Sequence, residues 1–299
     1  YSVIGGMWSL TLTDIIQFVI KTLGIFAVLL PLSISKAGGL SHMQEVLPAG
    51  FFDLGHIGLD TILTYFLLYF FGALIGQDIW QRVFTARSEK VVRYAGLGAG
   101  VYCMLYGLAC ALIGAAAHVL IPNLAVPENA YAEITRQVLE PGLRGLVVAA
   151  ALSAIMSTAS GCLLAAATVL QEDVYARFLR PGAPNGLRES RLFTLLMGVV
   201  MLALACLVND VIGALSIAYN LLVGGLLVPI LGALLWRRAS ARGAIASIVV
   251  GSLVVVLFMA IDGVLANTPI AYGLLASLVT FVVVSLAGAP AASLQAQAD

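Results

Sequence analysis

A cluster of hydroxyl side chains inside a long apolar segment is the part of this sequence most able to do chemistry. The segment 143–175 is long enough to cross a membrane, yet it carries Ser153, Ser157, Thr158 and Ser160 near its middle. In a membrane interior, hydroxyls and loosened carbonyls are among the few oxygens that could replace the water around a sodium ion. The segment is therefore a candidate cation site.

The spacing of this cluster supplies part of a ligand shell. Ala154, Ser157 and Thr158 stand at positions i, i+3 and i+4, so they share one helix face. Two hydroxyls and one carbonyl are too few for a hard cation, so another helix must add ligands. The alternative is that the hydroxyls bond back to the carbonyl four residues earlier or pack against small residues, as they commonly do in membrane helices. Spacing alone favours this alternative.

Polar residues also follow a glycine pair in segment 72–82, GALIGQDIWQR. Its two glycines weaken a helix near mid-membrane, and broken helices expose backbone groups to substrate in many transporters. Gly76, Gln77 and Asp78 are therefore candidate substrate-binding residues. The alternative is a helix that leaves the membrane, with Asp78 and Arg82 paired at i, i+4. We favour that pairing for Arg82, whereas the two interpretations balance for Gly76 and Gln77.

Two pairs of polar residues lie within other apolar runs. Asp14 and Lys21, seven residues apart, share one helix face. A charge there costs ~2.5–3.5 kcal/mol on insertion scales, so Lys21 is predicted to pair with a carboxylate or face one, although it could also snorkel. Tyr219 and Asn220 precede a GG…P pattern, and they could line a cavity or bond between helices.

The composition sets the class of protein that carries these residues. The chain is 61% hydrophobic and 10% charged, which predicts an all-α, polytopic membrane protein with the lipid bilayer as its surroundings. The net charge of zero gives no electrostatic argument for nucleic acid. The four cysteines lack metal or disulfide spacing. Walker, GxSxG and HExxH motifs are absent from the sequence, so we predict no enzyme.

Hydropathy predicts eight spanning helices. They cover Leu12–Ile34, Leu59–Arg82, Val91–Leu120, Gly145–Leu170, Arg191–Val208, Val211–Trp236, Gly243–Ile261 and Ile270–Leu286. Eleven of the 15 Lys and Arg residues fall in three alternate loops, which are predicted to be cytoplasmic. The loops Ser35–Gly58 and Pro122–Arg144 are then external and are predicted to lie over the outer mouth.

Four segments resemble one known family. YSVIGGMWSLTLTDIIQ is similar to the GG-x-x-(A/S)-V-x-x-T-D-x-x-Q stretch of the sodium/solute symporter family. GQDIWQRVFTARS resembles its QR-containing segment, and ALSAIMSTASGCLLAAATVLQEDVY its A-x-M-S-T helix ending in E-D-(I/V)-Y. PILGALLWRRASARGAIAS resembles the segment joining its later helices. The four matches occur in family order and cover nearly the whole chain.

The resemblance implies a leucine-transporter-type fold of two inverted repeats. Residues 1–58 would end the first repeat and its outer loop, 59–261 would form the second repeat, and 262–299 a flanking helix and tail. Most of the first repeat would then precede Tyr1, so the chain looks N-terminally truncated and is not expected to transport alone. Family members couple Na+ entry to uptake of a small organic solute.

The resemblance also implies roles for individual residues. The Ala154 carbonyl and the Ser157 and Thr158 hydroxyls would bind sodium. For the hydroxyl cluster, the resemblance therefore favours an ion site over backward hydrogen bonding. Asp14 would help sodium leave inward. The expected substrate-binding residues are Gly76, Gln77, Asp78, Tyr219, Asn220 and Lys21.

Departures from the family pattern bear on the solute. Gly76 and Asp78 replace a substrate-binding Asn and a gating Tyr of the sugar-transporting members, which disfavours a hexose. Ser160, then Gly161, replaces the aspartate that often follows S-T-A. Lys21 stands where an uncharged residue is expected and suits an anionic or zwitterionic solute.

We therefore predict a sodium-coupled symporter of an amino acid, organic acid or similar solute, working by alternating access. It would be a multi-pass protein of the cell membrane, in a bacterium the inner membrane. The alternative is a symporter-like sensor module of a signalling protein. An uncoupled channel fits the glycine-broken helices and long outer loops less well.

Overall fold

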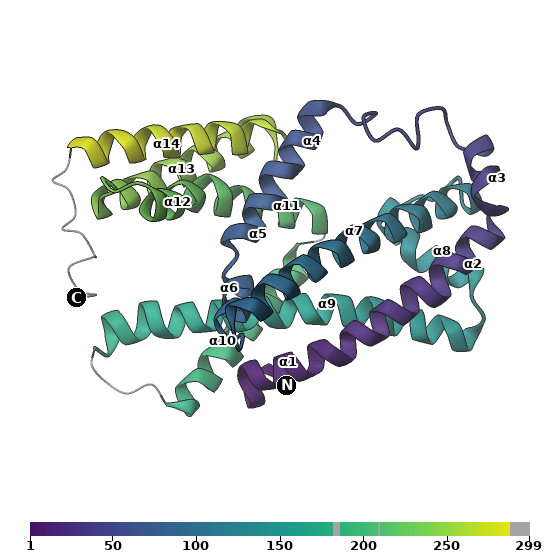
Figure 1. Ribbon diagram of the computed structural model, residues 1–299, viewed down its shortest axis with the longest axis horizontal. Helices are drawn as coiled ribbons and strands as arrows, with labels where there is room; N and C mark the ends of the chain where they lie inside the picture. The colour runs from purple at the N-terminus through teal and green to yellow at the C-terminus, as the bar shows by residue number, and fades with distance from the viewer. Residues whose placement is uncertain (182–185, 209, 288–299) are drawn as a thin grey trace. The chain divides into compact units, whose positions relative to one another are not determined.

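The computed structural model describes residues 1–181, 186–208 and 210–287, and in these ranges the only regular structure is helical (Figure 1). The α-helices and the π-helical (η) segments between them follow in one series. Its members are α1 (Ser2–Thr22), η1 (Leu23–Leu29), α2 (Leu30–Lys36), α3 (Gly39–Val46), α4 (Leu59–Tyr65), η2 (Phe66–Phe70), α5 (Phe71–Ile75), α6 (Gln77–Phe84), α7 (Glu89–Leu120), α8 (Ala130–Val138), α9 (Pro141–Val169), η4 (Leu170–Leu179), α10 (Leu187–Leu207), α11 (Val211–Leu222), η5 (Val223–Leu227), α12 (Val228–Leu235), α13 (Ala241–Asp262) and α14 (Thr268–Ala287). A short 3-10 turn, η3 (Pro127–Asn129), precedes α8.

All eight predicted spans have counterparts in the structure. Seven helical stretches are long and apolar enough to cross a membrane, and the pair Leu59–Ile75 and Gln77–Phe84, bent by 41°, makes an eighth if counted as one span. The predicted ends were too short in two places. The first span begins at Ser2 rather than Leu12, and the fourth continues through the charged residues to Leu179. Hydropathy locates the apolar part of a helix, whereas backbone hydrogen bonding continues into the polar flanks.

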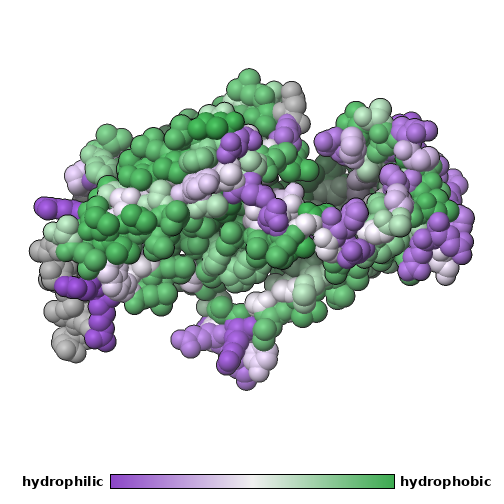
Figure 2. Space-filling model, turned by 90° about the horizontal axis from the view of Figure 1, so that it is seen from above, coloured by the Kyte–Doolittle hydropathy of each residue, from purple (hydrophilic) through white to green (hydrophobic). Residues whose placement is uncertain are grey.

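The molecular surface carries many large apolar side chains. Figure 2 shows hydrophobic residues over much of the visible face, with hydrophilic residues gathered in separate patches. Trp8 and Leu235, both on spanning segments, are more than four-fifths exposed at 87% and 81%. Apolar faces of this extent are unfavourable in water, so these faces suit a lipid environment.

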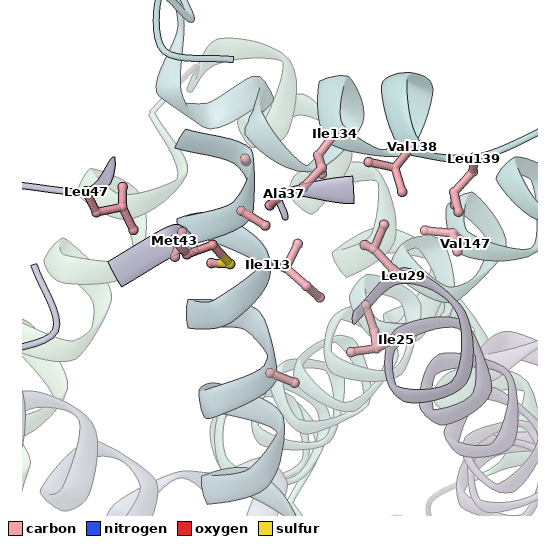
Figure 3. Packing of buried hydrophobic residues seen from close by; sticks show 14 residues of the cluster. Ile25, Leu29, Ala37, Met43, Leu47, Ile113, Ile134, Val138, Leu139 and Val147 are labelled. Carbon is pink, nitrogen blue, oxygen red and sulfur yellow. The ribbon is translucent and has the colours of Figure 1, made fainter. Parts of the chain in front are cut away.

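Contacts divide the chain into two compact units, which we describe separately. The first unit comprises Tyr1–Asp53 and Arg82–Leu202. Its buried core joins η1, α7, α8 and α9, and Ile25, Ile113 and Val147 are almost fully buried in it (Figure 3). Tyr131 at the edge of this core donates a hydrogen bond to the Val147 carbonyl at 2.8 Å, and burial raises the pKa of its hydroxyl. This core packs α7 and α9, two of the helices that carry the candidate site, against η1.

The second unit comprises Leu54–Gln81 and Ala203–Asp299, of which residues after Ala287 lie outside the described part. In it α13 and α14 pack side by side along their length (Figure 1). Glycines also let η5 pack closely against α13: a Cβ built on Gly251 would lie 2.4 Å from the Gly224 carbonyl oxygen. The repeat boundaries predicted at residues 58 and 261 follow a sequence pattern rather than contacts, and they stay a prediction.

Candidate cation and solute site

Close packing of α1 with α9 brings the predicted site residues of the first unit together. Gly24, in the π-helical η1, allows this approach, because a Cβ built there would lie only 2.4 Å from the Ala150 Cβ. Farther along the same pair of helices, Ser157 Oγ donates a hydrogen bond to Asp14 Oδ1 at 2.7 Å. Two residues that are 143 positions apart in sequence therefore form one polar contact.

Arg82 completes this cluster. Its Nη2 lies 3.2 Å from Asp14 Oδ2, and the two side chains are 37% and 23% exposed. The contact with Asp14 was not predicted, because the sequence analysis considered only Asp78, four residues earlier, as a partner of Arg82. The pairing of Arg82 with Asp78 stays a prediction. The local i, i+4 rule does not take account of a carboxylate from a distant helix.

Gly161 makes room for the guanidinium. A Cβ built on this buried glycine would lie 2.8 Å from Arg82 Nη2 and 3.3 Å from Cζ. The guanidinium thus lies directly against the backbone of α9, one turn beyond Ser157. Sequence reasoning did not include Arg82 or Gly161 in the site, although the QR segment and the unusual glycine were both visible signals.

The predicted sodium ligands share one helix but face two cavities. The aromatic cavity, of about 660 Å³, is lined by Ala154 and Thr158 together with Phe18, Lys21, Gly98, Ala99, Tyr102, Cys103, Tyr106 and Gly107. The charged cavity, of about 390 Å³, is lined by Ser157 together with Thr11, Asp14, Ile15, Phe18, Lys21 and Arg82. Phe18 and Lys21 belong to both linings, so the two cavities adjoin along α1.

The hydroxyl helix is continuous through the cluster. α9 runs without interruption from Pro141 to Val169, so the hydroxyls do not break it. Thr158 Oγ1 donates to the Ala154 carbonyl at 3.4 Å, and Ser160 Oγ donates to the Ser157 carbonyl at 3.2 Å. The bond from Thr158 reaches back four residues, as in the alternative interpretation, but it is long and therefore weak, and the bond from Ser160 reaches back three residues.

Lys21 has aromatic partners. Its Nζ lies 5.9 Å from the centroid of the Phe18 ring and 5.8 Å from that of Tyr102. The predicted pairing with a carboxylate is not found in the described residues, and Asp14 is bound to Arg82 instead. The seven-residue spacing predicts that Asp14 and Lys21 share a helix face. The neighbouring helices, however, decide which cation pairs with the Asp14 carboxylate.

In the second unit, the helix is interrupted at Gly76. α5 ends at Ile75, α6 begins at Gln77, and the extended backbone of Gly76 (φ −64°, ψ 120°) separates them. Trp80 Nε1 donates to the Leu74 carbonyl at 2.8 Å and so satisfies part of the end of α5. The predicted weak point is thus confirmed as a break, while the roles of Gly76, Gln77 and Asp78 toward substrate stay predictions.

The helix does not break at Gly72, where the missing side chain accommodates an aromatic ring. A Cβ built there would lie 2.1 Å from Tyr219 Cδ1, and the Tyr219 ring also meets Tyr69 edge-on at a centroid distance of 5.5 Å.

Asn220, the residue after Tyr219, is 1% exposed, and neither of its side-chain polar atoms has a hydrogen-bond partner in the described part of the protein. An unsatisfied buried amide is costly, so Asn220 is a polar group available to a ligand.

Gly72→Ala is expected to lower the free energy of unfolding by about 1–3 kcal/mol, because the new methyl group would overlap the Tyr219 ring. Thermal unfolding of the purified protein would measure this. Gly114→Ala is the control, because a Cβ built there meets nothing within 4 Å. Tyr219→Leu should rescue Gly72→Ala, and an equally stable Gly72→Ala variant would contradict the packing described here.

The spanning helices, the lipid-suited surface and the partly buried polar cluster together define a multi-pass helical membrane protein. The chain belongs to the sodium:solute symporter family, whose model matches residues 1–251. The Escherichia coli (strain K12) sodium/pantothenate symporter is 28% identical over 300 residues, covering 95% of this chain and 61% of that protein. The sodium/proline symporter of the same strain is 29% identical over 324 residues, covering 100% of this chain and 63% of that protein.

A solved structure shows the same fold. The chain matches a Na+-coupled sialic acid symporter with a TM-score of 0.81 and 19% identity, over 98% of this chain and 65% of that chain. The chain therefore spans less than two thirds of the length of these proteins. The predicted family and all-α fold class are confirmed. The relatives named here are transporters and give no support to the sensor alternative.

Proposed function

We propose that this protein carries out sodium-coupled symport of a small organic solute by alternating access. The observation that carries the proposal is the cluster of Asp14, Ser157 and Arg82, beside two further predicted sodium ligands on α9 in a member of this family. The named relatives transport proline and pantothenate with sodium, which supports a small organic solute. We place the protein in the cell membrane, in a bacterium the inner membrane, and assign it no enzymatic activity.

In this proposal sodium binds between the Ala154 carbonyl and the Ser157 and Thr158 hydroxyls. Ser157 is suited to this because a hydroxyl donates one hydrogen bond, here to Asp14, and still presents lone pairs to a cation. Thr158 would give up a weak hydrogen bond of 3.4 Å to turn its oxygen toward the ion. Sodium must bind the outward-open and inward-open states unequally for coupling to arise.

In this proposal Asp14 is the group that a sodium ion meets next when it leaves its site. Its carboxylate accepts a hydrogen bond from Ser157, so an ion leaving that hydroxyl meets a negative charge next. Arg82 neutralises this charge through the second carboxylate oxygen. Arg82 therefore keeps Asp14 from trapping the ion, because a cation and the guanidinium compete for the same carboxylate.

The solute would contact the break at Gly76, with Gln77 and Asp78 at the start of α6 and Tyr219 and Asn220 on α11. The exposed backbone at Gly76 and the unsatisfied amide of Asn220 support this assignment. Both features lie in the second unit. Lys21 is the candidate solute contact of the first unit.

The test is uptake of labelled proline and pantothenate by full-length protein in liposomes, driven by a sodium or an equimolar potassium gradient. Ser157→Ala is expected to lower sodium-driven uptake about 10- to 100-fold, since it removes a predicted ligand and the hydrogen bond to Asp14. Thr168→Val is the matched control: its hydroxyl, on the same helix, donates to the Leu164 carbonyl and to no other group in the described part of the chain. Uptake that is equal in both gradients for every solute tested would refute the proposal.

A further inference from the structure

Lys21 carries a charge in the middle of a spanning stretch without a carboxylate beside it. It lies within the span Ser2–Lys36. Among the residues that the structure describes, no carboxylate oxygen lies within ion-pair distance of its Nζ, and its contacts are the rings of Phe18 and Tyr102. Cation–π contacts offset only part of the cost of a charge in such surroundings. A positive charge in such surroundings suits an anionic ligand that binds and dissociates reversibly.

The aromatic cavity that Lys21 enters offers hydrogen-bond donors. Thr22 Oγ1 gives its proton to the Phe18 carbonyl at 2.6 Å, so in its 2.8 Å contact with Tyr102 the tyrosine hydroxyl must be the donor. Tyr106, one turn farther along α7, also lines the cavity, and its hydroxyl has no hydrogen-bond partner among the described residues. Lys21 and Tyr106 are thus two donors available to an acceptor in the cavity.

Apart from Thr158, the rest of the lining is largely apolar and leaves room for a ligand. Its volume of about 660 Å³ lies within the ~300–1,000 Å³ typical of small-molecule sites. One wall of the cavity is formed by residues with a small side chain or none, Gly98, Ala99 and Gly107. Another wall is formed by the rings of Phe18 and Tyr102. An uncharged solute such as a sugar would leave the Lys21 ammonium without an anionic partner.

We propose that Lys21 binds the carboxylate of an organic anion in the aromatic cavity, and that the transported solute is a carboxylate with an apolar or aromatic body. This rests on the proposed function for transport, because it names the solute class of that transporter. The cavity also links solute to ion, since Ala154 and Thr158 line it too. Sodium near the ammonium is repelled unless an anion enters, so each should tighten the binding of the other.

The test compares carboxylates with their neutral amides. The ligand-dependent rise in the unfolding temperature of full-length protein would be measured in potassium buffer with phenylacetate and phenylacetamide, and with cyclohexanecarboxylate and its amide. The wild type and Lys21→Arg are expected to bind the carboxylates about 10- to 100-fold more tightly than the amides. Lys21→Met, an apolar side chain of similar length, should lose that preference.

Binding in the cavity is checked at Cys103, an exposed thiol in its lining. Phenylacetate should slow alkylation of Cys103 in the wild type and leave it unchanged in Lys21→Met. Equal binding of carboxylates and amides, or a preference that survives Lys21→Met, would overturn the inference. Both measurements are made without sodium, so they are independent of the proposed coupling: carboxylate binding without sodium-driven uptake would refute the symporter proposal alone.

Discussion

Asp14→Asn is expected to lower sodium-driven uptake by more than about tenfold. Asp14 holds Arg82 through one oxygen and Ser157 through the other, at 3.2 and 2.7 Å. An amide keeps the shape but loses the charge, so it weakens a partly buried ion pair worth about 1–3 kcal/mol and removes the negative charge that a departing ion would meet. Initial rates of uptake in liposomes under a sodium gradient would measure the effect.

Asp14→Glu is the matched variant, because it keeps the charge on a side chain one methylene longer. It should retain more uptake than Asp14→Asn, and both variants should be recovered from the membrane in wild-type amounts. Asp14→Asn activity within a factor of two of the wild type would contradict the role given to this carboxylate. Loss of uptake in both variants, with normal recovery, would indicate that geometry matters here as much as charge.

Gly161→Leu is expected to expel the Arg82 guanidinium from its place on α9. Even a methyl group would lie 2.8 Å from Nη2, and a larger side chain leaves no room for the arginine beside Asp14. Asp14 would then face the ion path without its neutralising partner. We expect sodium to bind about tenfold more tightly and to leave more slowly, so that the apparent sodium affinity rises while turnover falls.

A double-mutant cycle separates this effect from general damage to the helix. Arg82→Ala should reproduce the Gly161→Leu phenotype, and combining the two should add little, because both remove the same contact. Gly145→Leu is the control on the same helix, where a built Cβ meets nothing within 4 Å. Additive effects of Gly161→Leu and Arg82→Ala on sodium affinity would contradict the contact as the cause.

The sequence predicted the fold class and the helices because both depend on local composition. Twenty-residue apolar runs locate spans, and glycine at position 76 marked the break that the structure contains. The shared face of Ala154, Ser157 and Thr158 followed from helical spacing alone. These features need no knowledge of which helices become neighbours.

The partners of the site residues could not be predicted in this way. For Arg82 the sequence suggested only Asp78, four residues away, and gave no sign of its contact with Asp14, which lies 68 residues earlier in the chain. Lys21 was expected beside a carboxylate and instead lies near two rings that contact each other, one of them from α7. Helix packing decides these contacts, and the glycines that permit it, such as Gly24 and Gly161, become recognisable only once the neighbouring atoms are placed.

Sodium binding itself can be measured directly. Binding of radioactive 22Na+ to purified full-length protein would be measured for the wild type, Ser157→Ala/Thr158→Ala and Thr168→Val. We expect saturable binding that potassium does not displace, that is lost in the double variant and that is retained in Thr168→Val. Undiminished binding in the double variant would contradict a sodium site at the hydroxyl cluster of α9.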